Sequence, residues 1–94
     1  MNDKSKKKMT ALVADDSVLL CNLLKESLLE LGFSQVIVAN DGAQAVKAYK
    51  NNSIDITFLD LEMPKVDGIG ALKEIRALDA DAYVVIVSGT GTAD

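Results

Sequence analysis

Residues 10–17 read TALVADDS, and this stretch decides the fold. The first five residues are apolar or β-branched with no polar alternation, and Asp15 and Asp16 then follow abruptly. An uninterrupted run of this kind is typical of a strand that is buried on both faces of a parallel sheet. Ser17 is a good N-cap, because its hydroxyl can accept a hydrogen bond from a free backbone N–H group of a following helix. The stretch therefore predicts a buried strand that leads directly into a helix.

The expected first helix runs to about residue 31, where Gly32 supplies a C-terminal stop. Leucines at helical spacing predict the stripe that faces the core: Leu20, Leu24, Leu28 and Leu31. More apolar residues lie outside this stripe than a fully solvated face requires: Val18, Leu19, Leu23 and Leu29. Cys21 is expected to pack near the edge of the helix rather than to act as a redox group.

The alternation of apolar runs and helical patterns continues along the chain. Strands are expected at residues 36–39, 54–59 and 83–87, and helices at 43–50 and 69–78. The alternating order of four strands and three helices indicates βαβ units, hence an α/β fold with a parallel sheet. Right-handed crossovers place helices on both faces of that sheet.

Length and composition limit the classes of function. A chain of 94 residues suffices for one small domain, and its net charge of −4 argues against direct binding of nucleic acid. One cysteine and no histidine exclude zinc sites of the Cys/His type, a histidine base and an internal disulfide. No apolar stretch approaches the length of a membrane span. Residues 1–8 are polar and lysine-rich and do not resemble a signal peptide, so we expect a flexible tail and a cytoplasmic location.

Side chains that can do chemistry follow three of the expected strands. Asp15 and Asp16 follow the first strand, Asp60 follows the third and Ser88 follows the fourth. Ligands of such sheets bind at the carboxyl ends of the strands, so the three carboxylates should converge if the first and third strands are neighbours. Converging carboxylates repel one another, and an all-oxygen set suits Mg²⁺, which also takes phosphate oxygens. The pattern indicates a place where a phosphoryl group meets a carboxylate nucleophile, with the Ser88 hydroxyl as a hydrogen-bond donor.

A simpler interpretation is open for each of these residues alone. An acidic residue after a strand is often only a helix cap, and capping is the favoured role for Asp16 or Ser17 taken singly. A serine that ends a strand, such as Ser88, is also common. The combination at three strand ends favours a phosphoryl site over a set of unrelated caps.

Three stretches resemble the receiver family of two-component response regulators: ALVADDS at 11–17, FLDLEMPKVDG at 58–68 and VVIVSG at 84–89. The resemblance runs from about residue 10 to the last residue and implies a flavodoxin-like fold. It implies that Asp60 accepts a phosphoryl group from the phosphohistidine of a histidine kinase or phosphotransfer protein. It further implies that Ser88 is the switch hydroxyl that contacts this group.

The metal ligands follow from the same resemblance. It implies that Mg²⁺ is held by Asp15, Asp16, Asp60 and the backbone carbonyl of Glu62. Of the first two, Asp16 is expected to bind the ion more directly.

The resemblance also marks a departure from the family. A complete receiver continues past the fourth strand into a fourth helix, a fifth strand and a fifth helix, and a lysine that ends the fifth strand contacts the phosphoryl group. Neither Lys65 nor Lys73 matches that position. We therefore expect residues 9–94 to form an incomplete (βα)3β receiver whose phosphoryl switching is impaired. The apolar, unprotected fourth strand at 83–87 predicts a homodimer that pairs there.

Two other classes of function remain open. A pseudo-receiver would use the same fold for protein docking without phosphorylation, and the missing lysine favours it. The intact Asp15, Asp16, Asp60 and Ser88 count against it. A hydrolase with an aspartyl nucleophile would need a second acid, for which Glu62 is the candidate by position. We expect a signalling module rather than an enzyme.

Overall fold

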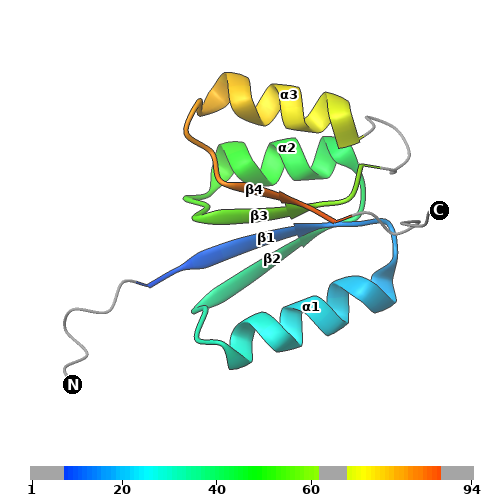
Figure 1. Cartoon of the computed structure of the whole chain (residues 1–94), viewed down its shortest axis with the longest axis vertical. Helices are drawn as coiled ribbons and strands as arrows, with labels where there is room; N and C mark the ends of the chain where they lie inside the picture. The colour runs from blue at the N-terminus through cyan, green and yellow to red at the C-terminus, as the bar shows by residue number, and fades with distance from the viewer. Residues whose placement is uncertain (1–7, 62–67, 88–94) are drawn as a thin grey trace.

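Four strands and three helices alternate along the chain in the computed structural model, which describes residues 8–61 and 68–87 (Figure 1). The elements are β1 (Thr10–Ala14), α1 (Val18–Glu30), β2 (Gln35–Ala39), α2 (Gly42–Asn51), β3 (Ile56–Leu59), α3 (Gly68–Leu78) and β4 (Val84–Ile86). The strands pair in parallel in the order β2-β1-β3-β4, with α1 on one face of the sheet and α2 and α3 on the other (Figure 1). The predicted α/β fold with its (βα)3β layout is confirmed. Apart from Lys8, the tail predicted at residues 1–8 lies outside the described residues.

The strand order reverses at β1, which lies between β2 and β3. The chain leaves β1 toward β2 on one side and later returns to β3 on the other. The carboxyl ends of β1 and β3 therefore flank the switch point where ligands of such sheets bind. The register pairs Ala14 with Leu59, and the N–H group of Asp60 donates to the Ala14 carbonyl at 2.9 Å. Asp15 and Asp60, which directly follow the two strands, are thus neighbours across the sheet.

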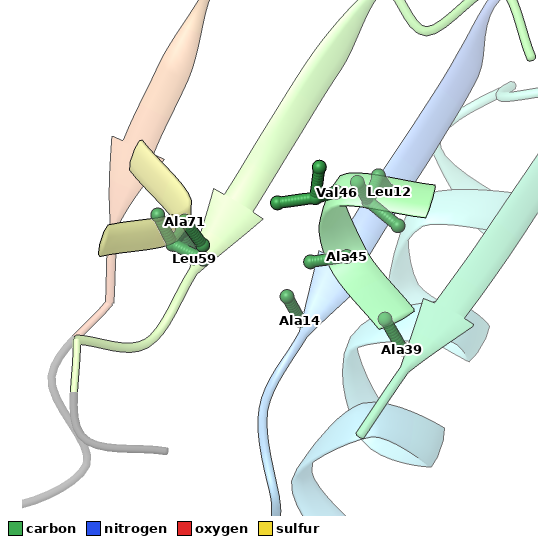
Figure 2. Packing of buried hydrophobic residues seen from close by; sticks show 7 residues of the cluster. All are labelled: Leu12, Ala14, Ala39, Ala45, Val46, Leu59 and Ala71. Atoms are coloured by element: carbon green, nitrogen blue, oxygen red, sulfur yellow. The ribbon is translucent and has the colours of Figure 1, made fainter. Parts of the chain in front are cut away.

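Small side chains allow the helices to pack closely on both faces of the sheet. On the side of α2 and α3, the buried cluster consists of Leu12, Ala14, Ala39, Ala45, Val46, Leu59 and Ala71 (Figure 2). On the side of α1, it consists of Ala11, Val13, Cys21, Leu28 and Val36. Strand β1 contributes to both clusters because its successive side chains alternate between the faces. This double burial fixes the position from which Asp15 emerges.

Helix α1 buries a different stripe from the one predicted. Cys21 and Leu28 are buried and Leu24 is half-buried, whereas Leu20 and Leu31 are 38% and 78% exposed. The helix packs on β1 and β2 through this narrow stripe, and Leu31 is the C-cap beyond the last helical residue. The prediction that Leu20 and Leu31 face the core is therefore wrong. Cys21 belongs to the core and not to the helix edge.

The surplus of apolar side chains on α1 is confirmed as exposed. It comprises Val18, Leu19, Leu23 and Leu29.

Within residues 8–61 and 68–87, no helix is long and apolar enough to cross a bilayer.

The local signals at the helix ends are confirmed. Ser17 Oγ accepts from the Leu20 N–H group at 3.2 Å and caps α1. Gly32 follows α1 with a φ of 110°, a conformation that side chains with a Cβ rarely adopt. Asp41 caps α2, because its Oδ1 accepts from the Gln44 N–H group at 2.8 Å.

The third strand is shorter than predicted. It begins at Ile56 instead of residue 54, and Asp55 before it bonds to the start of β1 in a different way. The Asp55 N–H group donates to the Thr10 carbonyl at 2.8 Å, while the Asp55 carboxylate accepts from the Thr10 N–H group at 2.7 Å. A side chain thus takes the place of one ladder bond, which the apolar pattern alone does not reveal.

Candidate metal and phosphoryl site

Three aspartates meet at the carboxyl edge of the sheet. Asp15 and Asp16 follow β1, Asp60 follows β3, and one carboxylate oxygen from each lies within 4.8 Å of the other two. Asp15 and Asp60 are 3% and 4% exposed, whereas Asp16 is exposed. The sequence predicted this convergence. It arises because β1 and β3 are paired in register up to the residues that precede the acids.

Asp15 is held through several of its polar groups. Its N–H group donates to the Ala39 carbonyl at 3.1 Å, and its Oδ1 accepts from the Ser17 N–H group at 2.9 Å. Its other carboxylate oxygen, Oδ2, is buried and has no hydrogen-bond partner in the described part of the chain. A buried oxygen of an ionised group is costly without a partner. Oδ2 therefore suits the coordination of a cation.

The electrostatics of the cluster favour a cation. Burial raises the pKa of Asp15 above its ordinary value of 3.8, the bond from the Ser17 N–H group opposes this shift, and Asp60 and Asp16 raise the pKa further. The charges of Asp60 and Asp16 make ionisation of Asp15 less favourable unless a positive charge lies nearby. The donor set contains only oxygen, which suits a hard divalent cation such as Mg²⁺. The residues present thus fit such an ion.

The same arrangement suits chemistry at phosphorus. A carboxylate can attack a phosphoryl group and form an acyl phosphate. Phosphoryl transfer depends mainly on positioning and on neutralisation of charge. Asp60 lies beside the Asp15–Asp16 pair at the same sheet edge, so a cation held by the three carboxylates would lie next to this potential nucleophile.

Two predicted members of the site, Glu62 and Ser88, lie outside the described residues, and their roles stay predictions. The structure does describe the end of β4. The N–H group of Val87 donates to the Leu59 carbonyl at 2.8 Å, which places the end of β4 beside the end of β3.

Sequence reasoning missed two residues that contact the site. Asn40 Nδ2 and Cys21 Sγ each donate to the backbone carbonyl of Asp15, both at 3.3 Å. Asn40 directly follows β2, so its place at the same sheet edge was a usable signal. Nothing in the sequence pattern pointed to the thiol contact of Cys21.

Comparison with known proteins gives a consistent result. Residues 11–94 match the family model described as the response regulator receiver domain. The chemotaxis protein CheY of Bacillus subtilis is 42% identical over 80 residues, which cover 85% of this chain and 67% of that protein. The corresponding protein of Thermotoga maritima is 34% identical over 80 residues, with the same coverage of both chains.

Solved structures with the same fold include two complexes. One is the CheX–CheY–BeF3–Mg²⁺ complex from Borrelia burgdorferi, with a TM-score of 0.87 and 37% identity, covering 98% of this chain and 70% of that chain. The other is the response regulator TrrA from Thermotoga maritima in complex with Mg²⁺–BeF. It gives a TM-score of 0.83 and 32% identity, covering 88% of this chain and 71% of that chain.

Proposed function

Because this chain belongs to the response regulator receiver family of two-component signalling, we propose that it accepts a phosphoryl group on Asp60 in an Mg²⁺-dependent reaction. The donor is the phosphohistidine of a histidine kinase or of a phosphotransfer protein, in the cytoplasm. The observation that carries the proposal is the buried Asp60 beside Asp15, whose Oδ2 is buried without a hydrogen-bond partner in the described residues. The complexes of two similar receivers with Mg²⁺ and a beryllium fluoride support the choice of ion.

In the proposed reaction, an Asp60 carboxylate oxygen forms a bond to phosphorus. The bond between phosphorus and the histidine nitrogen of the donor breaks, and the imidazole leaves with the electron pair of that bond. When bound, Mg²⁺ would supply neutralisation of the charge on the transferring group. Asp15 and Asp16 would hold the ion together with Asp60 and the Glu62 backbone carbonyl. Ser88 would donate a hydrogen bond to a phosphoryl oxygen.

Receivers act as signalling modules and are not enzymes in the usual sense. We propose that the chain catalyses its own phosphorylation and no other reaction. This separates it from a hydrolase, which would release the phosphoryl group in repeated turnovers, and from a docking module, which would not be labelled at all.

Labelling by a small phosphodonor tests the proposal. The parent chain is incubated with acetyl phosphate and Mg²⁺, and intact mass reports the addition of one phosphoryl group. Asp60→Asn should remove the label, because the amide keeps the shape of the side chain but is a poor nucleophile. Asp55→Asn is the matched control, since Asp55 lies at the opposite end of β3 from Asp60 and its carboxylate accepts from the Thr10 N–H group. Equal labelling of Asp60→Asn and the parent would show that the acceptor is assigned wrongly.

We also propose that two copies of this chain pair through β4. This strand is the outer strand of the described sheet, and Ile86 on it is 44% exposed. The Tyr83 carbonyl and the Val87 N–H group bond to β3, so by alternation the backbone groups of Val84 and Ile86 point away from the sheet. A two-fold axis would let these groups pair with the same groups of a second copy.

Light scattering after size exclusion tests this pairing. Ile86→Lys should shift a dimer toward monomer, because it places a charge in the apolar contact. Leu78→Lys is the matched control on α3, where the leucine is 47% exposed. A parent chain that elutes as a monomer at micromolar concentration would contradict the proposal.

A further inference from the structure

The structure assigns Asn40 and Cys21 as positioning residues for the acidic site, a role that rests on the proposed function. Both side chains donate to one acceptor, the backbone carbonyl of Asp15, each at 3.3 Å. They come from different elements. Cys21 lies on α1, whereas Asn40 lies between β2 and α2, and the two helices cover opposite faces of the sheet (Figure 1). The Asp15 carbonyl therefore accepts hydrogen bonds from two separate parts of the fold.

The orientation of this carbonyl matters because it belongs to the peptide plane that joins Asp15 to Asp16. Rotation of the plane would change the direction in which Asp16 leaves the end of β1, and with it the distance from Asp16 to Asp60. The N–H group and Oδ1 of Asp15 are already held by Ala39 and Ser17. With the carbonyl fixed as well, Oδ2 is the polar atom of Asp15 that remains for a ligand.

Each of the two donors is itself held in place. The Asn40 N–H group donates to Gln44 Oε1 at 3.0 Å, and Gln44 belongs to the first turn of α2. Cys21 is 1% exposed, and its N–H group donates to the Ser17 carbonyl at 3.0 Å. Rigid outer contacts of this kind orient metal ligands and are a recognised determinant of metal affinity. The Asn40 amide is a stronger hydrogen-bond donor than the Cys21 thiol, so Asn40 should contribute more to the affinity for Mg²⁺.

Mg²⁺ titration of the full chain, followed by the amide NMR shifts of Asp16 and Asp60, tests the assignment. Asn40→Ala should weaken Mg²⁺ binding by about threefold to tenfold, the range expected for one neutral hydrogen bond. Asn52→Ala is the matched control. Asn52 Nδ2 also donates to a backbone carbonyl, that of Ala48 at 2.9 Å, but at the far end of α2. This control should bind Mg²⁺ as the parent does, whatever it loses in stability.

The thiol is tested by a rescue. Cys21→Ala removes the donor, and we expect about threefold weaker Mg²⁺ binding. Cys21→Ser keeps a hydroxyl donor in the same place and should restore affinity to near the parent value. A purely structural role would predict that Mg²⁺ affinity follows the stability of the four variants and not the presence of the donors.

The outcomes separate the two proposals. If the parent binds Mg²⁺ and Asn40→Ala binds it equally well, the positioning role is wrong while the proposed function stands. If the parent shows no shift at millimolar Mg²⁺, the proposed function fails and the positioning role fails with it.

Discussion

Substitution of Gly68 by alanine should directly disturb Asp60, the proposed acceptor. Gly68 opens α3, and its N–H group donates to the Leu61 carbonyl at 3.1 Å. A Cβ at this position would lie 2.6 Å from the carbonyl carbon of Leu61, and closer still to the Leu61 Cα and the Asp60 carbonyl oxygen. All three atoms are backbone, so no flexible side chain can move aside. The backbone that carries Asp60 must shift instead.

Two opposing effects set the size of the change in stability. Alanine gains about 0.5–1 kcal/mol over glycine in a helix, because less backbone entropy is lost on folding. Overpacking of a rigid contact costs about 1–3 kcal/mol. The cost of the clash exceeds the gain in backbone entropy, and we expect a net loss of about 1–2 kcal/mol in the free energy of unfolding. We expect a shift of Asp60 on the order of 1 Å, and a misplacement of that size can slow a reaction by up to about a hundredfold.

The assay compares urea unfolding with the initial rate of labelling by acetyl phosphate. Gly32→Ala is the control, because a Cβ there meets no atom within 4 Å but must adopt the unfavourable φ of 110°. This variant should lose a similar amount of stability, about 1–2 kcal/mol, without a change in labelling rate. The reasoning is refuted if Gly68→Ala labels at the rate of the parent, or if Gly32→Ala slows labelling as much as Gly68→Ala does.

Three further predictions concern charge and capping. Because burial raises the pKa of Asp15 above 3.8, its contribution to stability is present below that value and lost as the pH rises through the folded pKa. In the presence of a chelator, Asp15→Asn should therefore be more stable than the parent at about pH 7 and nearly equal to it at about pH 3, and urea titrations that give the opposite order would contradict this. Burial and the hydrogen bond to Asp79 raise the pKa of Tyr49 from 10.0 to about 12, so the parent should lose stability across that interval relative to Tyr49→Phe. Parallel slopes for the two proteins in alkaline urea titrations would count against that bond. Asp41→Ala removes the N-cap bond to the Gln44 N–H group and should lower the free energy of unfolding by about 1–2 kcal/mol, which an unchanged urea midpoint would disprove.

The sequence allowed the strand ends to be predicted better than the helix faces. The abrupt change from apolar residues to Asp15, and again to Asp60, marks where a buried strand ends, and parallel pairing then forces both acids to one edge. The buried stripe of α1 depends instead on how the helix rotates over β1 and β2. Leucine occurs on several sides of this helix, so spacing alone does not identify the side that includes Cys21.

Contacts at the site were harder to predict for a related reason. The bonds from Asn40 and Cys21 to the Asp15 carbonyl join residues that are 25 and 6 positions apart in the chain. These bonds depend on the directions in which the side chains leave β2 and α1. The periodicity of apolar residues in the sequence does not determine those directions. Strand register was the one long-range feature that the pattern constrained, because a shift of one residue would turn the apolar face of a strand to solvent.

The distribution of contacts around the site determines where a response to the proposed phosphorylation can occur. A ligand shifts a protein between two arrangements only by its different affinity for them, so a switch requires an element that has two arrangements. Strand β1 is buried on both faces, and Asp15 is held at its N–H group, its carbonyl and Oδ1. Strand β4 is instead the outer strand of the described sheet, is three residues long and leaves Ile86 exposed. Its last described bond to the sheet runs from the Val87 N–H group to the carbonyl of Leu59, the residue that directly precedes Asp60. A conformational response to a phosphoryl group on Asp60 is therefore expected on the β3–β4 side of the site, while β1 and Asp15 are expected to stay in place.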